Sequence, residues 1–271
     1  IFDKSGKKVR ASISLISSYG MKKNQQDRIK LASIIELLHT ATLVHDDIID
    51  NSDLRRGRTT VNVAWSNSHG VLIGDFIYSK AFMLMNEIGN FKVIDELSSA
   101  TNKIAEGELM QLANKNNLAT SLQQLKKISY YKTGRLFEAS AKSAAMLSGK
   151  STPFIENISK AAKLIGIAFQ VRDDLLDYGI SKGNIGKPEM QDILEDKITY
   201  PLYFALKSSS KKDSLKILKK LKNKDFSVKE VADFVSSSSA FNKCNSLIEN
   251  YSNEISKCIN KISNKEIRDE M

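Results

Sequence analysis

Apolar residues return every three or four positions along most of this chain, which is the spacing of amphipathic helices. The spacing predicts helices near residues 11–21, 26–50, 73–85, 92–113, 121–148, 154–178 and 192–207, and two or three lysine-rich helices over 211–267. Polar stretches at 51–60, 114–120 and 179–188 are predicted to be loops. No linker or fixed-period repeat divides the sequence. We therefore expect residues 1–271 to form a single-domain, all-α helical bundle.

Two of the predicted helices have apolar residues on nearly every face. Residues 31–44 (LASIIELLHTATLV) show this pattern, and so do residues 161–171 (AAKLIGIAFQV) apart from Lys163 and Gln170. A helix that is apolar all round is buried inside a protein rather than lying on its surface. Both segments are therefore predicted to be core helices.

The same acidic pattern ends both of these helices, as Asp46-Asp47-Ile48-Ile49-Asp50 and as Asp173-Asp174-Leu175-Leu176-Asp177. On a helix, the first and last Asp of each row lie within about 40° of each other. A partly buried row of like charges is costly unless cations neutralise it. Carboxylates suit Mg²⁺, which keeps several waters and bridges to substrate phosphates. One such row alone is more simply a solvated helix end, but two rows after two buried helices predict a diphosphate held by metal ions.

The composition favours helices over strands and gives little support for nucleic-acid binding. Pro occurs 3 times and Gly 13 times, fewer than a β-rich chain needs for its turns. The net charge is +10, from 41 Lys and Arg against 31 Asp and Glu. The lysines are scattered and rarely interleaved with aromatic residues, which favours a solvated basic face. We expect no nucleic-acid partner.

The two cysteines and the hydropathy of the chain bear on the cellular compartment in which the protein is expected. Cys244 and Cys258 would lie about 21 Å apart on one continuous helix, beyond the reach of a disulfide. They are expected to be reduced, as in a cytoplasmic protein. No run of 18 apolar residues occurs, so the sequence predicts no membrane span and at most a peripheral membrane contact.

Basic residues suited to phosphate groups flank the acidic rows in the sequence. Arg matches phosphate oxygens with two parallel donors, and Lys acts as a point charge. The candidates are Gly6-Lys7-Lys8-Val9-Arg10, His39, Arg55-Arg56-Gly57, Lys132-Thr133, Lys187 and Lys197. Each alone is more simply a surface cation, and His39 a core histidine, but their joint order around two acidic rows favours a diphosphate site.

With these stretches the chain resembles the trans-type polyprenyl diphosphate synthases over nearly its whole length. The other matching stretches are residues 36–50 (ELLHTATLVHDDIID), Gly74-Asp75-Phe76, Glu106-Gly107-Glu108, residues 169–177 (FQVRDDLLD), Gly186-Lys187-Pro188 and residues 192–201 (DILEDKITYP). Within the family, the pattern is most similar to bacterial octaprenyl diphosphate synthases, which make quinone side chains such as that of ubiquinone.

The resemblance implies a helical isoprenoid-synthase bundle around a deep central cavity, acting as a homodimer. Isopentenyl diphosphate would condense with an allylic diphosphate, expected to be farnesyl diphosphate. The metals and cations would stabilise the departing pyrophosphate, the double bond would attack the allylic cation, and a proton would then be lost. No protein nucleophile is required.

The resemblance also assigns residues to these roles. About three Mg²⁺ ions would be held by Asp46, Asp47, Asp50, Asp173 and Asp177. The allylic diphosphate would be held by Arg55, Lys132, Thr133, Gln170, Lys187 and Lys197. Isopentenyl diphosphate would be held by Lys7, Arg10, His39 and Arg56. The residues expected to carry catalysis are Asp46, Asp47, Asp50, Lys132, Asp173 and Lys187.

The chain departs from the family pattern at a few positions and at its ends. Ala11 replaces a usual Pro, Arg172 interrupts an apolar run, and Met190 and Asp196 replace glycines near the lysine loop. Because the chain begins at Ile1, we expect a segment upstream. The C-terminus stops short of the basic end usual in the family, so it is expected to be incomplete or to lack the closing segment.

Small residues before the first acidic row predict a long product, of about eight isoprene units (C40). Ala41 and Thr42 lie about one turn before Asp46, where short-chain members of the family place aromatic rings as a floor. Met83, Met85 or Ile35 would then form a deeper floor. The alternative is that Ala41 and Thr42 only allow close helix packing.

Four other functions compete with this interpretation. A shorter-chain synthase (C15–C20) would share every motif. A non-catalytic subunit of a heteromeric synthase should have lost aspartates from one row, yet all six remain. A terpene cyclase would lack the isopentenyl diphosphate site. A His-Asp phosphohydrolase is disfavoured because the chain has only His39, His45 and His69.

Overall fold

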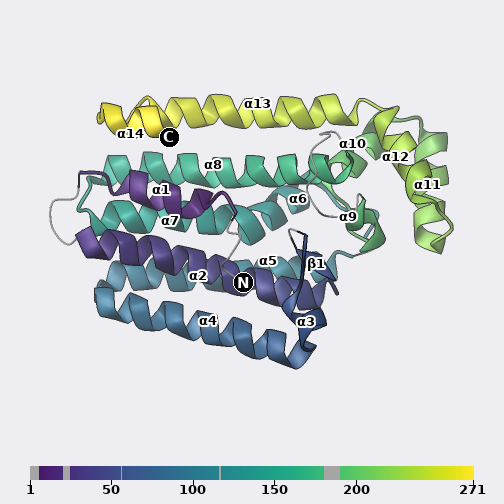
Figure 1. The fold of residues 1–271 in the computed structure, drawn as a ribbon. Helices are drawn as coiled ribbons and strands as arrows, with labels where there is room; N and C mark the ends of the chain where they lie inside the picture. Colours follow the sequence, from purple (N-terminus) through teal and green to yellow (C-terminus); the bar gives the residue numbers. More distant parts are fainter. Residues whose placement is uncertain (1–5, 21–24, 56, 116, 180–189) are drawn as a thin grey trace.

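Long helices, packed roughly side by side, run the length of the molecule (Figure 1). The computed structural model describes the whole chain except residues 1–5, 21–24, 56, 116 and 180–189. The first half contains α1 (Val9–Ser17), α2 (Gln25–Ile49), β1 (Leu54–Arg55), β2 (Arg58–Thr59), α3 (Val61–Ala64), α4 (Asn67–Ile88), α5 (Phe91–Ala113) and α6 (Leu122–Ser129). The second half contains η1 (Tyr130–Gly134), α7 (Arg135–Leu147), α8 (Thr152–Asp177), α9 (Gln191–Leu194), α10 (Tyr200–Ser208), α11 (Lys211–Asn223), α12 (Val228–Ser236), α13 (Ala240–Ile259) and α14 (Lys265–Glu270).

The all-α prediction is confirmed, and most of the predicted helices are present within a few residues of their expected bounds. α2, α4, α5 and α8 match the segments predicted near 26–50, 73–85, 92–113 and 154–178. Local capping explains several helix starts: the Asn90 side chain accepts from the backbone N–H groups of Lys92 and Val93. Ser121 and Gln124 form a reciprocal capping box at α6.

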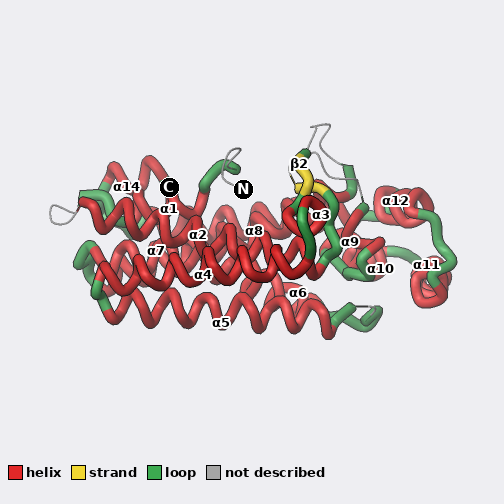
Figure 2. The backbone as a smooth tube through the Cα atoms, turned by 60° about the horizontal axis from the view of Figure 1, so that its bottom comes forward, coloured by secondary structure: helices red, strands yellow, loops and turns green. Residues whose placement is uncertain are grey.

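Three predicted segments differ from the structure. The segment near 121–148 is not one uniform α-helix, because the π-helical turn η1 joins α6 to α7. The helix predicted over 192–207 is wrong in its middle, since α9 ends at Leu194 and α10 begins at Tyr200. The loop predicted at 51–60 contains a short antiparallel strand pair, β1 with β2 (Figure 2).

The core of the bundle consists of two adjoining apolar clusters. One lies among α2, α4, α5 and α7 and includes fully buried Leu31, Leu38 and Leu97. The other lies among α1, α7, α8, α13 and α14 and includes Phe137 and Ile158. These clusters confirm that the apolar segments of α2 and α8 are core helices.

A separate cluster holds the helices at one end of the molecule, where α10, α11 and α12 gather in Figure 1. Cys244 and Cys258 are both buried and free, as expected from their spacing. Within the described ranges, the structure has no helix long and apolar enough to cross a membrane.

Candidate active site

A large cavity follows α2 from Glu36 to Asp50, a length of about 21 Å along a helix. Its volume is about 1260 Å³, which exceeds the roughly 300–1,000 Å³ of ordinary small-molecule sites. Residues from α1, α2, α5, α7, α8 and the segment before α10 line it. The prediction of a deep central cavity agrees with this arrangement.

The first acidic row occupies the last turn of α2, where Asp46, Asp47 and Asp50 all line the cavity. Burial is the main cause that raises the pKa of Asp46 to about 6; nearby Lys132 opposes this rise, while Glu108 and Asp50 add to it. Asp47 is buried, and its Oδ1 accepts a hydrogen bond of 2.6 Å from Nε of Arg55. The row therefore concentrates negative charge that water alone does not solvate.

The second acidic row ends α8, but its three aspartates have different surroundings. Asp173 is exposed and faces the cavity. Asp174 is buried and accepts hydrogen bonds from the Gln170 side chain (2.8 Å) and the Tyr200 backbone (3.2 Å). Burial raises the pKa of Asp174 well above its usual value, and the charge of Asp192 adds to the effect.

Asp177 has a structural task that sequence reasoning did not foresee. Its two carboxylate oxygens accept hydrogen bonds from the backbone N–H groups of Gln191 (3.0 Å) and Asp192 (3.2 Å), at the start of α9. Asp177 is not among the described cavity-lining residues. In this conformation the Asp177 side chain fixes the α8–α9 junction, and its assignment to a metal stays a prediction.

Asp192 takes a place in the cavity that the sequence reasoning did not assign. It lines the cavity together with Asp173 and Asp174. Burial raises the pKa of Asp192 to about 7, and Asp177 reinforces the rise while Lys197 opposes it. The sequence did contain a signal for Asp192, since this residue begins the stretch at residues 192–201 that resembles the family pattern.

Lys132 and Thr133 lie next to each other on η1 and both line the cavity. The Lys132 ammonium is 2.7 Å from Oε2 of Glu108 and 2.6 Å from Oε1 of Gln111, both on α5. The Thr133 hydroxyl donates to Gln170 on α8 at 2.7 Å. Glu108 belongs to the Glu106-Gly107-Glu108 motif, but the sequence alone did not predict its contact with Lys132.

Lys197 lies on the segment between α9 and α10 and is largely buried. Its ammonium is 3.1 Å from Oδ1 of Asp50, and it also pairs with Glu195. Burial opposes the charged form, but the carboxylates of Asp50, Asp192 and Glu195 outweigh it and raise the pKa of Lys197. The structure thus joins a predicted diphosphate ligand to the first acidic row.

The predicted isopentenyl diphosphate ligands come together where α1 meets α2. Lys7, Arg10 and His39 all line the cavity. Nη1 of Arg10 lies 3.0 Å from Nε2 of His39, and the Arg10 guanidinium stacks 4.5 Å from the ring centre of Phe137. The predictions for Arg56 and Lys187 fall outside the described residues.

The residues predicted to set product length are placed differently from one another. Thr42 lines the cavity, whereas Ala41 is fully buried in the protein core. Met85 is also a core residue, and Met83 is 56% exposed on the outer side of α4. None of Ala41, Met83 and Met85 is among the described residues that line the cavity, and their role in setting product length stays a prediction. An aromatic side chain, Tyr78 of α4, does line it.

Two departures from the family pattern have a conformational consequence. Met190 and Asp196 both have φ near +61°, the left-handed region. Side chains with a Cβ are disfavoured in this region, and glycine is not. Met190 and Asp196 thus adopt a backbone conformation that glycine adopts without strain.

The carboxylates of the cavity suit hard divalent cations whose remaining ligands come from water and a diphosphate. In the part of the chain that the structure describes, no three Asp, Glu, His or Cys side chains converge into a closed metal site. Mg²⁺ needs only one or two protein carboxylates when water and substrate phosphates supply the other ligands. Asp46, Asp50 and Asp173 line one cavity, so carboxylates from both acidic rows face the same enclosed space.

The family model for polyprenyl synthetases matches residues 1–237, most of the chain. The chain therefore belongs to the polyprenyl synthetase family. This confirms the resemblance seen in the motifs and defines the class of protein to which the cavity belongs.

Curated relatives place the chain more closely within that family. It is 40% identical over 201 residues to the octaprenyl diphosphate synthase of Escherichia coli K12, covering 74% of this chain and 62% of the relative. It is 40% identical over 210 residues to an all-trans-nonaprenyl-diphosphate synthase (geranyl-diphosphate specific) of Rhodobacter capsulatus, covering 77% of this chain and 64% of the relative. The matched part thus spans about three fifths of the length of these relatives.

Solved structures share the fold almost throughout. A polyprenyl synthase from Caulobacter crescentus, complexed with calcium and isoprenyl diphosphate, superposes with a TM-score of 0.92 at 29% identity, covering 98% of this chain and 82% of the other. A decaprenyl diphosphate synthase from Rhodobacter capsulatus gives 0.91 at 29% identity, with the same coverage. The fold is therefore that of the helical isoprenyl synthases.

Proposed function

We propose that this protein is a Mg²⁺-dependent trans-prenyltransferase that condenses isopentenyl diphosphate with an allylic diphosphate. One observation carries the proposal: acidic rows from α2 and α8 line a single large cavity that also contains Lys132, Lys197 and Arg10. Carboxylates and cations in one enclosed space suit a diphosphate with bound metal ions. The names of the octaprenyl and nonaprenyl relatives support the same chemistry.

The residues divide into two sets within this proposal. Asp46, Asp50 and Asp173 would hold about three Mg²⁺ ions together with the diphosphate, and the ions would stabilise charge on the departing pyrophosphate. Lys132, Thr133 and Lys197 would bind the allylic diphosphate. Lys7, Arg10 and His39 would bind isopentenyl diphosphate and hold its double bond toward the allylic carbon.

The cavity supports a long product, proposed as about eight isoprene units. Its length along α2 and the small Thr42 side chain leave room below the acidic row. A shorter product, of about three or four units, is the second candidate. Tyr78 favours it, because this ring lines the cavity and its pKa is raised to about 12, chiefly by burial and further by the charge of Asp46.

We also propose that two copies of the chain associate through α4 and α5. α4 lies along the lower edge of the bundle in Figure 1, and its side chains Leu72, Phe76 and Met83 are 66%, 63% and 56% exposed. Their spacing places them along one stripe of the helix. Leu109 of α5, which also lines the cavity, is 67% exposed. An apolar stripe of this kind suits an isologous contact between identical subunits.

The direct test is incubation with radiolabelled isopentenyl diphosphate, farnesyl diphosphate and Mg²⁺, with products separated by chain length. We expect an elongated prenyl diphosphate that requires both substrates and the metal. An Asp53→Asn variant is a suitable control, because Asp53 is exposed and is not among the described residues that line the cavity. Absence of any elongated product would reject the proposed activity.

A further inference from the structure

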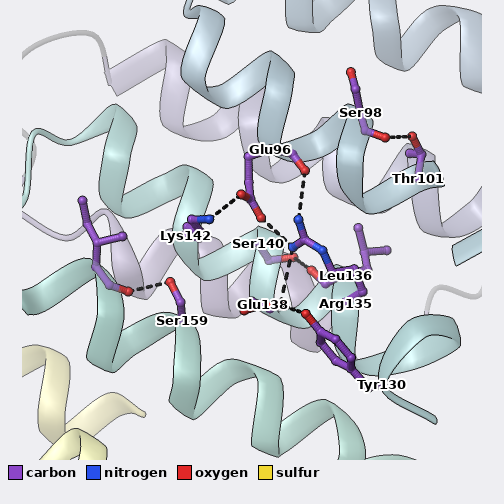
Figure 3. A network of polar contacts seen from close by, with 11 residues as sticks. Glu96, Ser98, Thr101, Tyr130, Arg135, Leu136, Glu138, Ser140, Lys142 and Ser159 are labelled. Carbon is purple, nitrogen blue, oxygen red and sulfur yellow. Dashed lines mark hydrogen bonds and ion pairs between the residues drawn. The ribbon is translucent and has the colours of Figure 1, made fainter. Parts of the chain in front are cut away.

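A buried polar network lies behind η1, on the side of α5 and α7 (Figure 3). Nη1 of Arg135 donates to Oε1 of Glu96 at 2.5 Å, and the other oxygen of Glu96 is 2.7 Å from the Lys142 ammonium. Arg135 and Glu96 are 7% and 6% exposed. None of Glu96, Arg135, Glu138 or Lys142 is among the described residues that line the cavity. The substrate-binding scheme above therefore leaves this network without a role.

The network connects the two ends of η1 to one carboxylate. Tyr130 opens the turn, and its hydroxyl donates to Oε2 of Glu138 at 2.6 Å. Arg135 is the residue at which α7 begins, and its Nη1 lies 3.6 Å from the same oxygen. Burial and the bond to Glu138 both raise the pKa of Tyr130, so its phenol stays protonated and remains a donor. Glu138 therefore bridges the start and the end of the π-helical turn.

Two glycines hold the backbone of η1 from opposite sides. A Cβ on Gly107 of α5 would lie 2.7 Å from Cβ of Tyr131 and 2.8 Å from the backbone nitrogen of Lys132. A Cβ on Gly166 of α8 would lie 2.6 Å from Cα of Gly134. Both positions exclude any larger residue, so η1 fits between two helices with backbone contact on each side.

A π-helical turn is a rare and costly departure from the α-helix, and it recurs at functional sites. Here the turn carries the adjacent Lys132 and Thr133, both of which line the cavity. Consecutive residues of a regular α-helix point about 100° apart, so the register of this turn decides whether both can reach the same ligand. A network that fixes both ends of the turn also fixes that register.

We propose that Tyr130, Arg135 and Glu138, anchored by Glu96, are positioning residues that lock η1 in the register that directs Lys132 and Thr133 toward the allylic diphosphate. The proposal rests on the proposed function for the identity of the ligand. It adds a specific role for a buried charge network outside the cavity. The isopentenyl diphosphate ligands lie just before α1 and on α1 and α2. Arg10 stacks on Phe137 of α7, so this site should depend on the network less than the allylic site, whose ligands lie on η1 itself.

The first test compares Tyr130→Phe with Tyr131→Phe. Tyr131 is the neighbouring ring, stacked near Lys103 and Lys127 rather than bonded to Glu138. Tyr130→Phe should raise KM for the allylic diphosphate about tenfold, the size expected when a hydrogen bond to a charged group no longer holds a binding segment. KM for isopentenyl diphosphate should change by less than about twofold. Tyr131→Phe should leave both constants unchanged.

The second test measures amide hydrogen exchange, which does not depend on turnover. In Tyr130→Phe, amides of residues 130–135 should exchange faster, while those of α2, α4 and α13 keep their wild-type rates. Glu138→Gln keeps an acceptor for the Tyr130 hydroxyl, so exchange in η1 should stay as slow as in the wild type. Glu138→Leu removes the acceptor, so exchange in η1 should become faster. A general loss of stability would instead raise exchange throughout the chain.

These results separate the positioning role from the proposed function. If the wild-type chain forms no product, the proposed function fails, and exchange in η1 and calorimetric binding of inorganic diphosphate with Mg²⁺ still decide the role of the network. The positioning role is overturned if exchange in η1 is unchanged, if both tyrosine variants behave alike, or if both KM values rise together.

Discussion

The ammonium group of Lys197 lies 3.1 Å from Oδ1 of Asp50, although 147 residues separate the two in the chain. The pair joins the first acidic row to the segment between α9 and α10, and both side chains are largely buried. It is therefore a contact that only folding creates, and it lies where charge on the diphosphate would be held.

We expect Lys197→Met to abolish most condensation activity and to lower the free energy of unfolding by about 3–5 kcal/mol, because Asp50 loses its partner in a buried site. Lys224→Met is the matched control: Lys224 pairs with Asp196 at 2.9 Å but is 66% exposed, so its loss should cost at most about 1 kcal/mol. Urea unfolding and initial rates provide the measurements. Equal effects of the two variants would contradict the role given to Lys197.

Asp46→Asn should lower the rate of condensation by about a hundredfold or more, because it removes a carboxylate from the site that stabilises the leaving group. Folding should not suffer. Burial raises the pKa of Asp46 to about 6, so the folded protein already disfavours its charge near neutral pH. We expect the Tm without metal to stay equal or to rise. Near-normal turnover of the variant would sink the metal assignment.

The free energy of unfolding of the metal-free protein should fall as the pH rises from about 4 to about 7, and Asp192 should contribute to this fall. Its folded-state pKa of about 7 lies above the ordinary value of 3.8, so folding takes up a proton between these values and stability is lost as the pH rises through the folded pKa. Asp192→Asn should flatten the dependence of Tm on pH in EDTA. An unchanged slope would show that this carboxyl does not titrate as argued.

Product length should respond to Thr42 and Tyr78 rather than to Ala41. Thr42→Phe should shorten the main product because a ring would enter the cavity below the acidic row. Tyr78→Ala should lengthen the product or leave it long, because it removes a ring from the wall. Ala41→Phe should instead destabilise the fold, since the core around this side chain is fully closed. Chromatography of dephosphorylated products, with Tm as a folding check, distinguishes these outcomes.

Phe76→Glu should convert a dimer to monomers in light-scattering measurements after gel filtration. The ring is 63% exposed on α4, so a carboxylate there costs little in one subunit but would be desolvated in an interface. Lys216→Glu alters an exposed side chain on α11, away from α4 and α5, and provides a charge-changing control. A wild-type chain that is monomeric at micromolar concentration would contradict the proposed association.

The local pattern of this sequence was sufficient to predict the all-α class of fold and the two buried helices whose acidic ends line the cavity. Apolar residues on all faces of residues 31–44 and 161–171 predicted buried helices, and burial is the property that makes the acidic rows after them unusual. These are local signals, because helical periodicity and charge spacing are written in neighbouring residues. The motifs shared with the polyprenyl synthetase family selected Lys132, Thr133 and Arg10, and all three line the cavity.

Tertiary packing alone decided which members of those patterns face the cavity. Asp177 belongs to the second row by sequence, yet its oxygens bind the start of α9, while Asp192 enters the cavity instead. Met83 and Ala41 differ from their expected places because the packing of α4 and α2 determines which side chain meets the cavity, the core or solvent. The π-helical turn η1 packs closely against Gly107 of α5 and Gly166 of α8, which are contacts between separate segments of the chain. Periodicity identifies a helix, but its rotation and its partners depend on long-range contacts that no local pattern contains.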